Sequence, residues 1–64
     1  MKWTDIYDIA ISLEEQHPDI DVTHIKFTDL MSMVMELDGF TGEPKHCNEK
    51  ILEAIQMAWI DERK

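Results

Sequence analysis

The sequence predicts an all-α fold, a small three-helix domain whose order of elements resembles a winged-helix or helix-turn-helix core. Apolar residues recur three and four positions apart in three separate segments, which is the spacing of a buried helical face. Capping residues precede these segments, and proline or glycine follows the first two. A chain of 64 residues has room for one domain, so residues 1–64 are expected to fold as a single unit.

The first predicted helix runs from Asp5 to about Gln16. Thr4 is the expected N-cap, and the carboxylate of Asp5 suits the positive end of a helix. The apolar stripe consists of Ile6, Ile9, Ala10 and Leu13. Pro18 ends the helix, because a proline disfavours helical backbone angles in the residue before it.

The second predicted helix follows a short helical turn at residues 21–24. Thr28 is the expected N-cap, and the helix is expected to end near Leu37. Its apolar stripe consists of Leu30, Met33, Val34 and Leu37. Residues 38–44 contain both glycines and one of the two prolines, so they predict a loop. Phe40 is expected to tie this loop to the core.

The third predicted helix begins after Asn48, a strong N-cap residue. Its apolar stripe consists of Ile51, Leu52, Ile55, Ala58 and Trp59. Arg63 and Lys64 lie near the C-terminal end, where positive charge is favourable. Trp3 and Trp59 are expected to pack the first and last helices together.

Acidic residues dominate the chain, with 14 Asp and Glu against 6 Lys and Arg and a net charge of −8. Residues 3–44 contain ten acidic residues and a single Lys or Arg, Lys26. Nucleic-acid binding is not expected, because it depends on cations that contact phosphates. The charge favours a basic protein partner or a hard, oxygen-seeking metal ion. It is equally compatible with a surface that is merely soluble.

Other features of the sequence bound the cellular setting. The longest apolar runs are only a few residues long, so no membrane span is expected. The N-terminal residues lack the apolar stretch of a signal peptide. A single cysteine, Cys47, excludes an internal disulfide. These features predict a soluble cytoplasmic protein, and we expect a monomer.

Asp5 and Asp8 form the candidate metal site that helical spacing suggests, since they lie one turn apart on a face shared with Glu15. Such a site is open and weak, and an ordinary solvated helix face explains the same spacing. The glycine loop does not fit a calcium-binding loop, because Phe40 and Gly42 occupy positions that need oxygen ligands.

Catalysis is not expected from this chain. Cys47 follows His46, but a nucleophile and its base need a spatial hydrogen bond rather than adjacency in sequence. The position of Cys47 before a helix suggests a lowered pKa, and its role stays open. No phosphate loop, nucleophile elbow or enclosed carboxylate pair is present. The sequence therefore does not predict an enzyme.

Several segments, in order along the chain, resemble the IscX family, a small acidic protein of bacterial iron–sulfur cluster assembly. They are Lys2-Trp3-Thr4-Asp5, Pro18-Asp19-x-Asp21, Phe27-Thr28-Asp29, Leu37-x-x-Phe40 followed by Pro44, and Asn48-Glu49-Lys50-Ile51-Leu52-Glu53-Ala54-Ile55 with Trp59 and Asp61-Glu62. The resemblance implies a winged-helix-like fold without DNA binding. The loop before Pro44 departs from it, because the family typically carries a denser acidic run there.

The resemblance also implies a function. Family members bind ferrous iron weakly through surface carboxylates, and they dock on the cysteine desulfurase at a basic surface that bacterial frataxin also uses. The chain is therefore expected to be an iron-binding adaptor or regulator of that enzyme. With Asp8 added from helical spacing, the expected iron ligands are Asp5, Asp8, Asp29, Asp61 and Glu62. The expected partner contacts are Asp19, Asp21, Glu36, Asp38 and Glu43. The alternative is an acidic protein-interaction module with no physiological metal.

Overall fold

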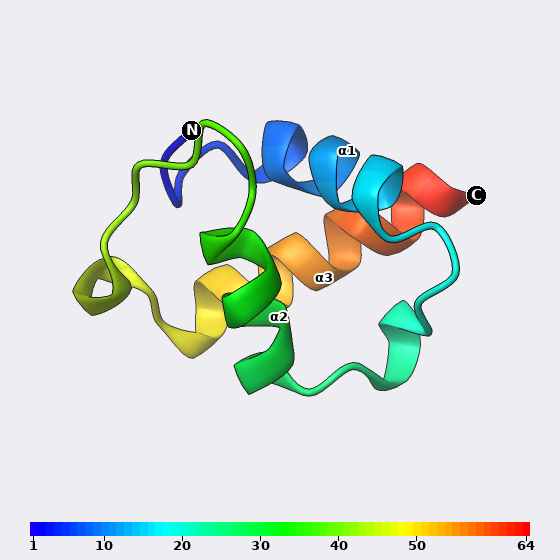
Figure 1. Cartoon of the computed structure of the whole chain (residues 1–64). Coiled ribbons are helices and arrows are strands. Elements are labelled where there is room, and N and C mark those ends of the chain that lie inside the picture. Colours follow the sequence, from blue (N-terminus) through cyan, green and yellow to red (C-terminus); the bar gives the residue numbers. More distant parts are fainter.

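Three α-helices make up the computed structural model, which describes residues 1–64 (Figure 1). They are α1 (Ile6–Gln16), α2 (Phe27–Met35) and α3 (Glu49–Arg63). Two single-turn 3₁₀ helices, η1 (Val22–His24) and η2 (Pro44–His46), lie in the connections. No residue is in a strand, so the all-α prediction is confirmed and no β-hairpin wing accompanies the helices. None of the helices is both long and apolar enough to cross a lipid bilayer.

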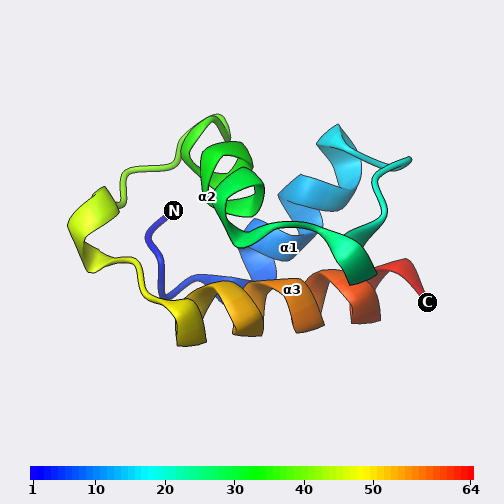
Figure 2. The ribbon, with the colours of Figure 1, turned by 90° about the horizontal axis from the view of Figure 1, so that it is seen from below.

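The longest helix, α3, carries the other two. Figure 2 shows α3 along one side of the molecule with α1 and α2 lying over it, and both helices contact α3. The apolar stripes predicted for the three helices meet in this space. The fully buried side chains of greatest volume are Trp59, Ile9, Leu13, Leu30, Ile55 and Val34. Burial of these apolar surfaces is the main stabilising contribution to the fold.

The N-terminal segment is hydrogen-bonded to the loop before α3. The backbone nitrogen of Met1 donates to the carbonyl oxygen of Gly39 at 2.7 Å, and the N–H of Thr41 donates to the carbonyl of Met1 at 2.7 Å. The indole N–H of Trp3 donates to the carbonyl oxygen of Glu43 at 2.7 Å. Trp3 therefore joins the chain start to the loop.

Phe40 holds the loop against the core, as predicted. Its ring meets the edge of Trp3 with centroids 4.8 Å apart and an interplanar angle of 76°, a favourable aromatic geometry. A Cβ atom at Gly42 would lie 2.6 Å from the Phe40 ring and 2.8 Å from the Trp3 ring. Only glycine therefore lets the loop pass this close to the two rings.

Two of the three predicted N-caps are wrong. The N-cap position of α1 is Asp5 rather than Thr4, and the Asp5 carboxylate accepts the backbone N–H of Lys2 at 2.9 Å instead of capping the helix. The N-cap position of α2 is Lys26, so Thr28 lies inside the helix. The first helical bond of α2 runs from the N–H of Leu30 to the carbonyl of Lys26, at 2.9 Å.

The reason for the early start of α2 is burial of Phe27. This half-buried side chain packs against the core as the first residue of the helix, and tertiary packing outweighs a local capping preference. At the other end α2 stops at Met35, two residues before the predicted Leu37. Leu37 is nevertheless buried, because the turn that follows the helix still directs it into the core.

The third predicted cap is confirmed, and it allows a direct test. The side chain of Asn48 accepts the backbone N–H of Ile51 at 2.9 Å. We expect Asn48→Ala to lower the free energy of unfolding by about 0.5–2 kcal/mol, because this N–H loses its partner. The matched control is Thr28→Ala, which we expect to change stability by less than about 0.5 kcal/mol, because an exposed Thr inside a helix caps nothing. Urea unfolding followed by circular dichroism measures both, and an equal loss in the two variants would contradict the assignment.

Candidate acidic interaction surface

Carboxylates cover the surface of the molecule. Of the 14, only Glu14 is half-buried, and the other 13 are exposed. Four form ion pairs: Glu14 with Arg63, Asp21 with His24, Glu43 with Lys45, and Asp61 with Lys64. The remaining ten carboxylates have no ion-pair partner. Their charge is therefore available to an external cation or to a basic protein surface.

Arg63, in the last turn of α3, organises one end of the molecule. Its guanidinium pairs with Glu14 of α1 at 2.8 Å. It also donates to the carbonyl oxygen of His17 at 3.1 Å and to that of Ile20, both in the connection that follows α1. The same guanidinium lies over the buried Trp59 ring, 5.6 Å from its centroid, a distance suited to a cation–π contact. One side chain thus fastens α1, the α1–α2 connection and α3 to each other.

This fastening assembles six carboxylates at one end of the fold. They lie in the last turn of α1, in the following connection and in the last turn of α3, three segments that meet near the C-terminus in Figure 1. We call this set the acidic pole, and its members are Glu14, Glu15, Asp19, Asp21, Asp61 and Glu62. The basic side chains of these segments are Arg63 and Lys64 in α3 and Lys26 at the far end of the connection, with His17 and His24 between. The pole is therefore strongly negative.

The charges within the acidic pole affect each other. The hydrogen bond from Arg63 is the main cause that lowers the pKa of Glu14, and the positive charge of Arg63 adds to this effect. The hydrogen bond that Arg63 donates to Glu14 raises the pKa of Arg63, with further contributions from the charges of Glu14, Asp19 and Asp21. The pKa of Asp21 is lowered, mainly by its hydrogen bond with His24. The shifts of Glu14 and Asp21 both favour the ionised form of these two carboxylates.

One polar atom beside the acidic pole has no hydrogen bond. The indole nitrogen of Trp59 is buried and unpaired, although the indole lies close enough to Glu14 to favour the ionised carboxylate slightly. The Trp59 ring also faces His17, with centroids 6.5 Å apart. Trp59 therefore lies in the core directly beneath two residues of this end of the fold, His17 and Arg63.

The five expected iron ligands lie at three separate helix ends. Asp5 and Asp8 lie at the start of α1, Asp29 in the first turn of α2, and Asp61 and Glu62 in the last turn of α3. No three His, Cys, Asp or Glu side chains come close enough together to hold one metal ion. What the geometry offers a cation is exposed carboxylates at single helix ends.

The five expected partner contacts fall into three places. Asp19 and Asp21 belong to the acidic pole. Glu36 and Asp38 line a hollow of about 440 Å³ together with His17, so this hollow adjoins the pole. Glu43 lies apart, in the loop that Trp3 holds, and pairs with Lys45 at 3.2 Å.

The sequence missed the role of Arg63 in assembling this surface. Arg63 and Glu14 are 49 residues apart, so no helical spacing connects them. The sequence placed Arg63 only as a favourable charge near a helix end. It assigned no role to Glu14 and placed Glu15 on the helix face of Asp5 and Asp8. The connection depends on how α1 packs on α3, which a local pattern does not reveal.

Cys47 differs from the sequence-based expectation. Its side chain is half-buried, and burial raises the pKa of the thiol above its ordinary value. Desolvation, which disfavours the charged thiolate, therefore acts against the lowering of the pKa that the position before a helix suggests.

Two comparisons with known proteins bear on this surface. The sequence model of the family described as iron–sulphur cluster assembly matches residues 1–64. The chain is also similar to an uncharacterized protein of Pseudomonas aeruginosa, with 49% identity over 63 residues, which cover 98% of this chain and 96% of that protein.

The Glu14–Arg63 pair predicts a specific pH dependence of stability. Because the folded state lowers the pKa of Glu14, the stabilisation is fully present above its ordinary value of 4.5 and is lost as the pH falls through the folded-state pKa. We expect Glu14→Gln to be less stable than the wild type near neutral pH and to approach it in acid. Urea unfolding between about pH 3 and 7 measures this difference. Glu15→Gln is the matched control, because Glu15 has no ion pair, and a pH-independent deficit in Glu14→Gln would contradict the prediction.

Proposed function

Because the chain belongs to the iron–sulphur cluster assembly family known as IscX, we propose that it is an iron-binding adaptor that docks on the cysteine desulfurase of that machinery and regulates it. The observation that carries this proposal is the set of ten exposed carboxylates without ion pairs on a chain of charge −8. A basic patch on the enzyme is the complementary surface. Bacterial frataxin is the expected competitor for that patch.

The proposed docking face consists of the acidic pole and the adjoining hollow. It includes Asp19, Asp21, Glu36 and Asp38. The contacts of Arg63 with Glu14 and with the carbonyl of His17 hold its part on α1 and the connection. Complementary charge steers two proteins together and speeds their association. Glu43 lies outside this face, so in this proposal it contacts the partner through a separate patch.

The proposed iron sites are exposed carboxylates at helix ends. Asp5 and Asp8 lie three residues apart at the start of α1, so the Asp8 carboxylate and the free oxygen of Asp5, whose other oxygen accepts the N–H of Lys2, are the proposed ligands of one cation. Asp29, Asp61 and Glu62 would act as single ligands, because neighbours in a helix such as Asp61 and Glu62 do not face each other. Water would complete the coordination of ferrous iron at each of these positions, which fits weak binding of a cargo ion.

A second candidate is an acidic interaction module without a physiological metal. The absence of any cluster of three ligand side chains favours it. Competition between divalent ions distinguishes the two candidate functions. If the chain has no physiological metal, magnesium and calcium should displace ferrous iron at similar concentrations, because only general charge attraction acts.

The docking face predicts which charge reversals weaken the complex with the desulfurase. We expect Asp19→Lys and Asp38→Lys each to weaken binding at least about tenfold at low salt. Glu53→Lys is the matched control, because it changes the net charge equally from an exposed position on α3 outside the face. Backbone amide shifts of the labelled protein, titrated with the enzyme at about 50 and 300 mM salt, measure binding and its screening. Equal weakening by all three variants would mean that only net charge acts.

The iron sites are tested separately from docking. We expect the double variant Asp5→Asn with Asp8→Asn to bind ferrous iron at least about fivefold more weakly, because removing one charge from each ligand lowers its affinity for a hard cation. Asn keeps the oxygen that accepts the N–H of Lys2, so the helical circular-dichroism signal is expected to stay unchanged. Glu49→Gln with Glu53→Gln removes another pair one turn apart and serves as the control in anaerobic titrations. Unchanged iron affinity in the first variant would remove Asp5 and Asp8 from the site.

A further inference from the structure

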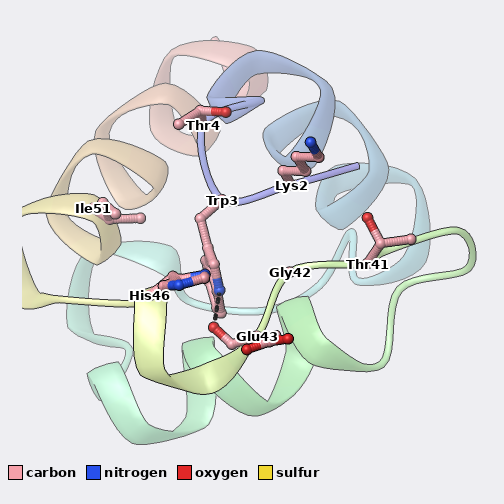
Figure 3. Close-up of a pocket in the computed structure, with 8 residues that line it drawn as sticks. All are labelled: Lys2, Trp3, Thr4, Thr41, Gly42, Glu43, His46 and Ile51. Carbon is pink, nitrogen blue, oxygen red and sulfur yellow. Dashed lines mark hydrogen bonds between the residues drawn. The ribbon is translucent and has the colours of Figure 1, made fainter.

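A pocket of about 380 Å³ lies at the end of the molecule where the N-terminal segment meets the loop before α3 (Figure 3). Its volume falls at the lower end of the range of about 300–1,000 Å³ that is common for small-ligand sites. Asp19, Asp21, Glu36 and Asp38 do not line it. It is therefore separate from the docking face proposed above.

The wall of the pocket is apolar and held in place. Trp3 and Ile51 supply its two large apolar side chains. The indole N–H of Trp3 is already bonded to the carbonyl of Glu43 (Figure 3), so the ring offers a ligand only carbon surface. Phe40 packs against Trp3, and Gly42 approaches both rings too closely for any larger residue. A wall fixed in this way loses little conformational entropy when a ligand binds.

The rim of the pocket carries an unneutralised positive charge. The Lys2 ammonium lies at the rim and has no ion-pair partner, and His46 and the hydroxyl of Thr4 also line the opening (Figure 3). The one carboxylate at the rim, Glu43, is paired with Lys45 at 3.2 Å. In a chain of charge −8, this is a place where an anionic ligand finds a free cation. Ammonium–carboxylate hydrogen bonds are charge-assisted and stronger than neutral ones.

We propose that this pocket binds a small carboxylate that carries an apolar group. The apolar group lies against Trp3 and Ile51, and the carboxylate accepts hydrogen bonds from Lys2 and Thr4. Either a free organic acid or the C-terminal carboxylate of a peptide provides this chemistry. The inference does not depend on iron binding or on docking to the desulfurase.

The test uses three probes of the same shape and different charge. The labelled full chain is titrated with 3-phenylpropionate, with its neutral amide and with 3-phenylpropylamine, and amide shifts are followed. We expect saturable shifts for the carboxylate at residues 2–4 and 41–46 and at the Trp3 indole N–H, with affinity at least about fivefold above that of the amide. The buried indole of Trp59 is the internal control and should not shift. Equal affinity for all three probes, or no saturable shift with the carboxylate, would overturn the proposal.

Variants separate the charge of Lys2 from the charge of the whole chain. We expect Lys2→Gln to remove the preference for the carboxylate over the amide, while Lys26→Gln, the same change at an exposed lysine outside the pocket, leaves it intact. An equal loss in both variants would overturn the assignment to Lys2.

A peptide Gly-Gly-Gly-Phe, with a free or an amidated C-terminus, shows whether the bound carboxylate comes from a peptide end or from a free organic acid. Tighter binding of the free peptide than of 3-phenylpropionate supports a peptide end, and weaker binding supports a free organic acid.

Discussion

The contact of Arg63 with α1 is the interaction on which the functional surface depends. Without it, the last turn of α3 would lose its side-chain contacts with α1 and with His17 and Ile20. The side chain of Gln56, earlier in α3, would be the remaining polar link from this helix to the connection. Each of these segments is short and strongly acidic, and their mutual repulsion opposes close approach. A single guanidinium offsets this repulsion with directed hydrogen bonds, and the flat group also covers the Trp59 ring. The same residue thus stabilises the fold and creates a concentrated negative field.

The two ends of the molecule are fastened by different kinds of interaction. At the acidic pole the fastening is ionic, with exposed or half-exposed groups, and it is sensitive to salt and acid. At the other end it consists of the hydrogen bond from the terminal ammonium of Met1 to Gly39, the backbone hydrogen bond from Thr41 to Met1 and the Trp3–Phe40 contact. Only the first of these involves a charged group. The acidic end is proposed to meet a protein, and the other end holds the pocket that Lys2 and Trp3 line.

The apolar stripes, the Asn48 cap and the role of Phe40 followed from the sequence, because each depends on neighbours within one or two helical turns. The caps at Thr4 and Thr28 failed, because burial of Phe27 and the bond from Lys2 to Asp5 decided where α2 and α1 begin. For the candidate site, the Asp5–Asp8 pair was visible as helical spacing. The acidic pole and the pocket at Trp3 were not, since they join residues from opposite ends of the chain. Such contacts depend on the packing of α1 on α3.

Because Arg63 lies in the last turn of α3, local opening of that turn would also change the arrangement of the acidic pole. The final turn of a terminal helix ordinarily opens and closes freely, and it is the first part of a domain that proteases trim. Here each opening of that turn would also release Glu14 and the carbonyls of His17 and Ile20. The negative end would then spread into three loosely connected segments. A partner that binds the closed arrangement would consequently protect the C-terminal residues from carboxypeptidase. The rate of cleavage at α3 would then report whether the acidic pole, including the end of α1 and the α1–α2 connection, is assembled.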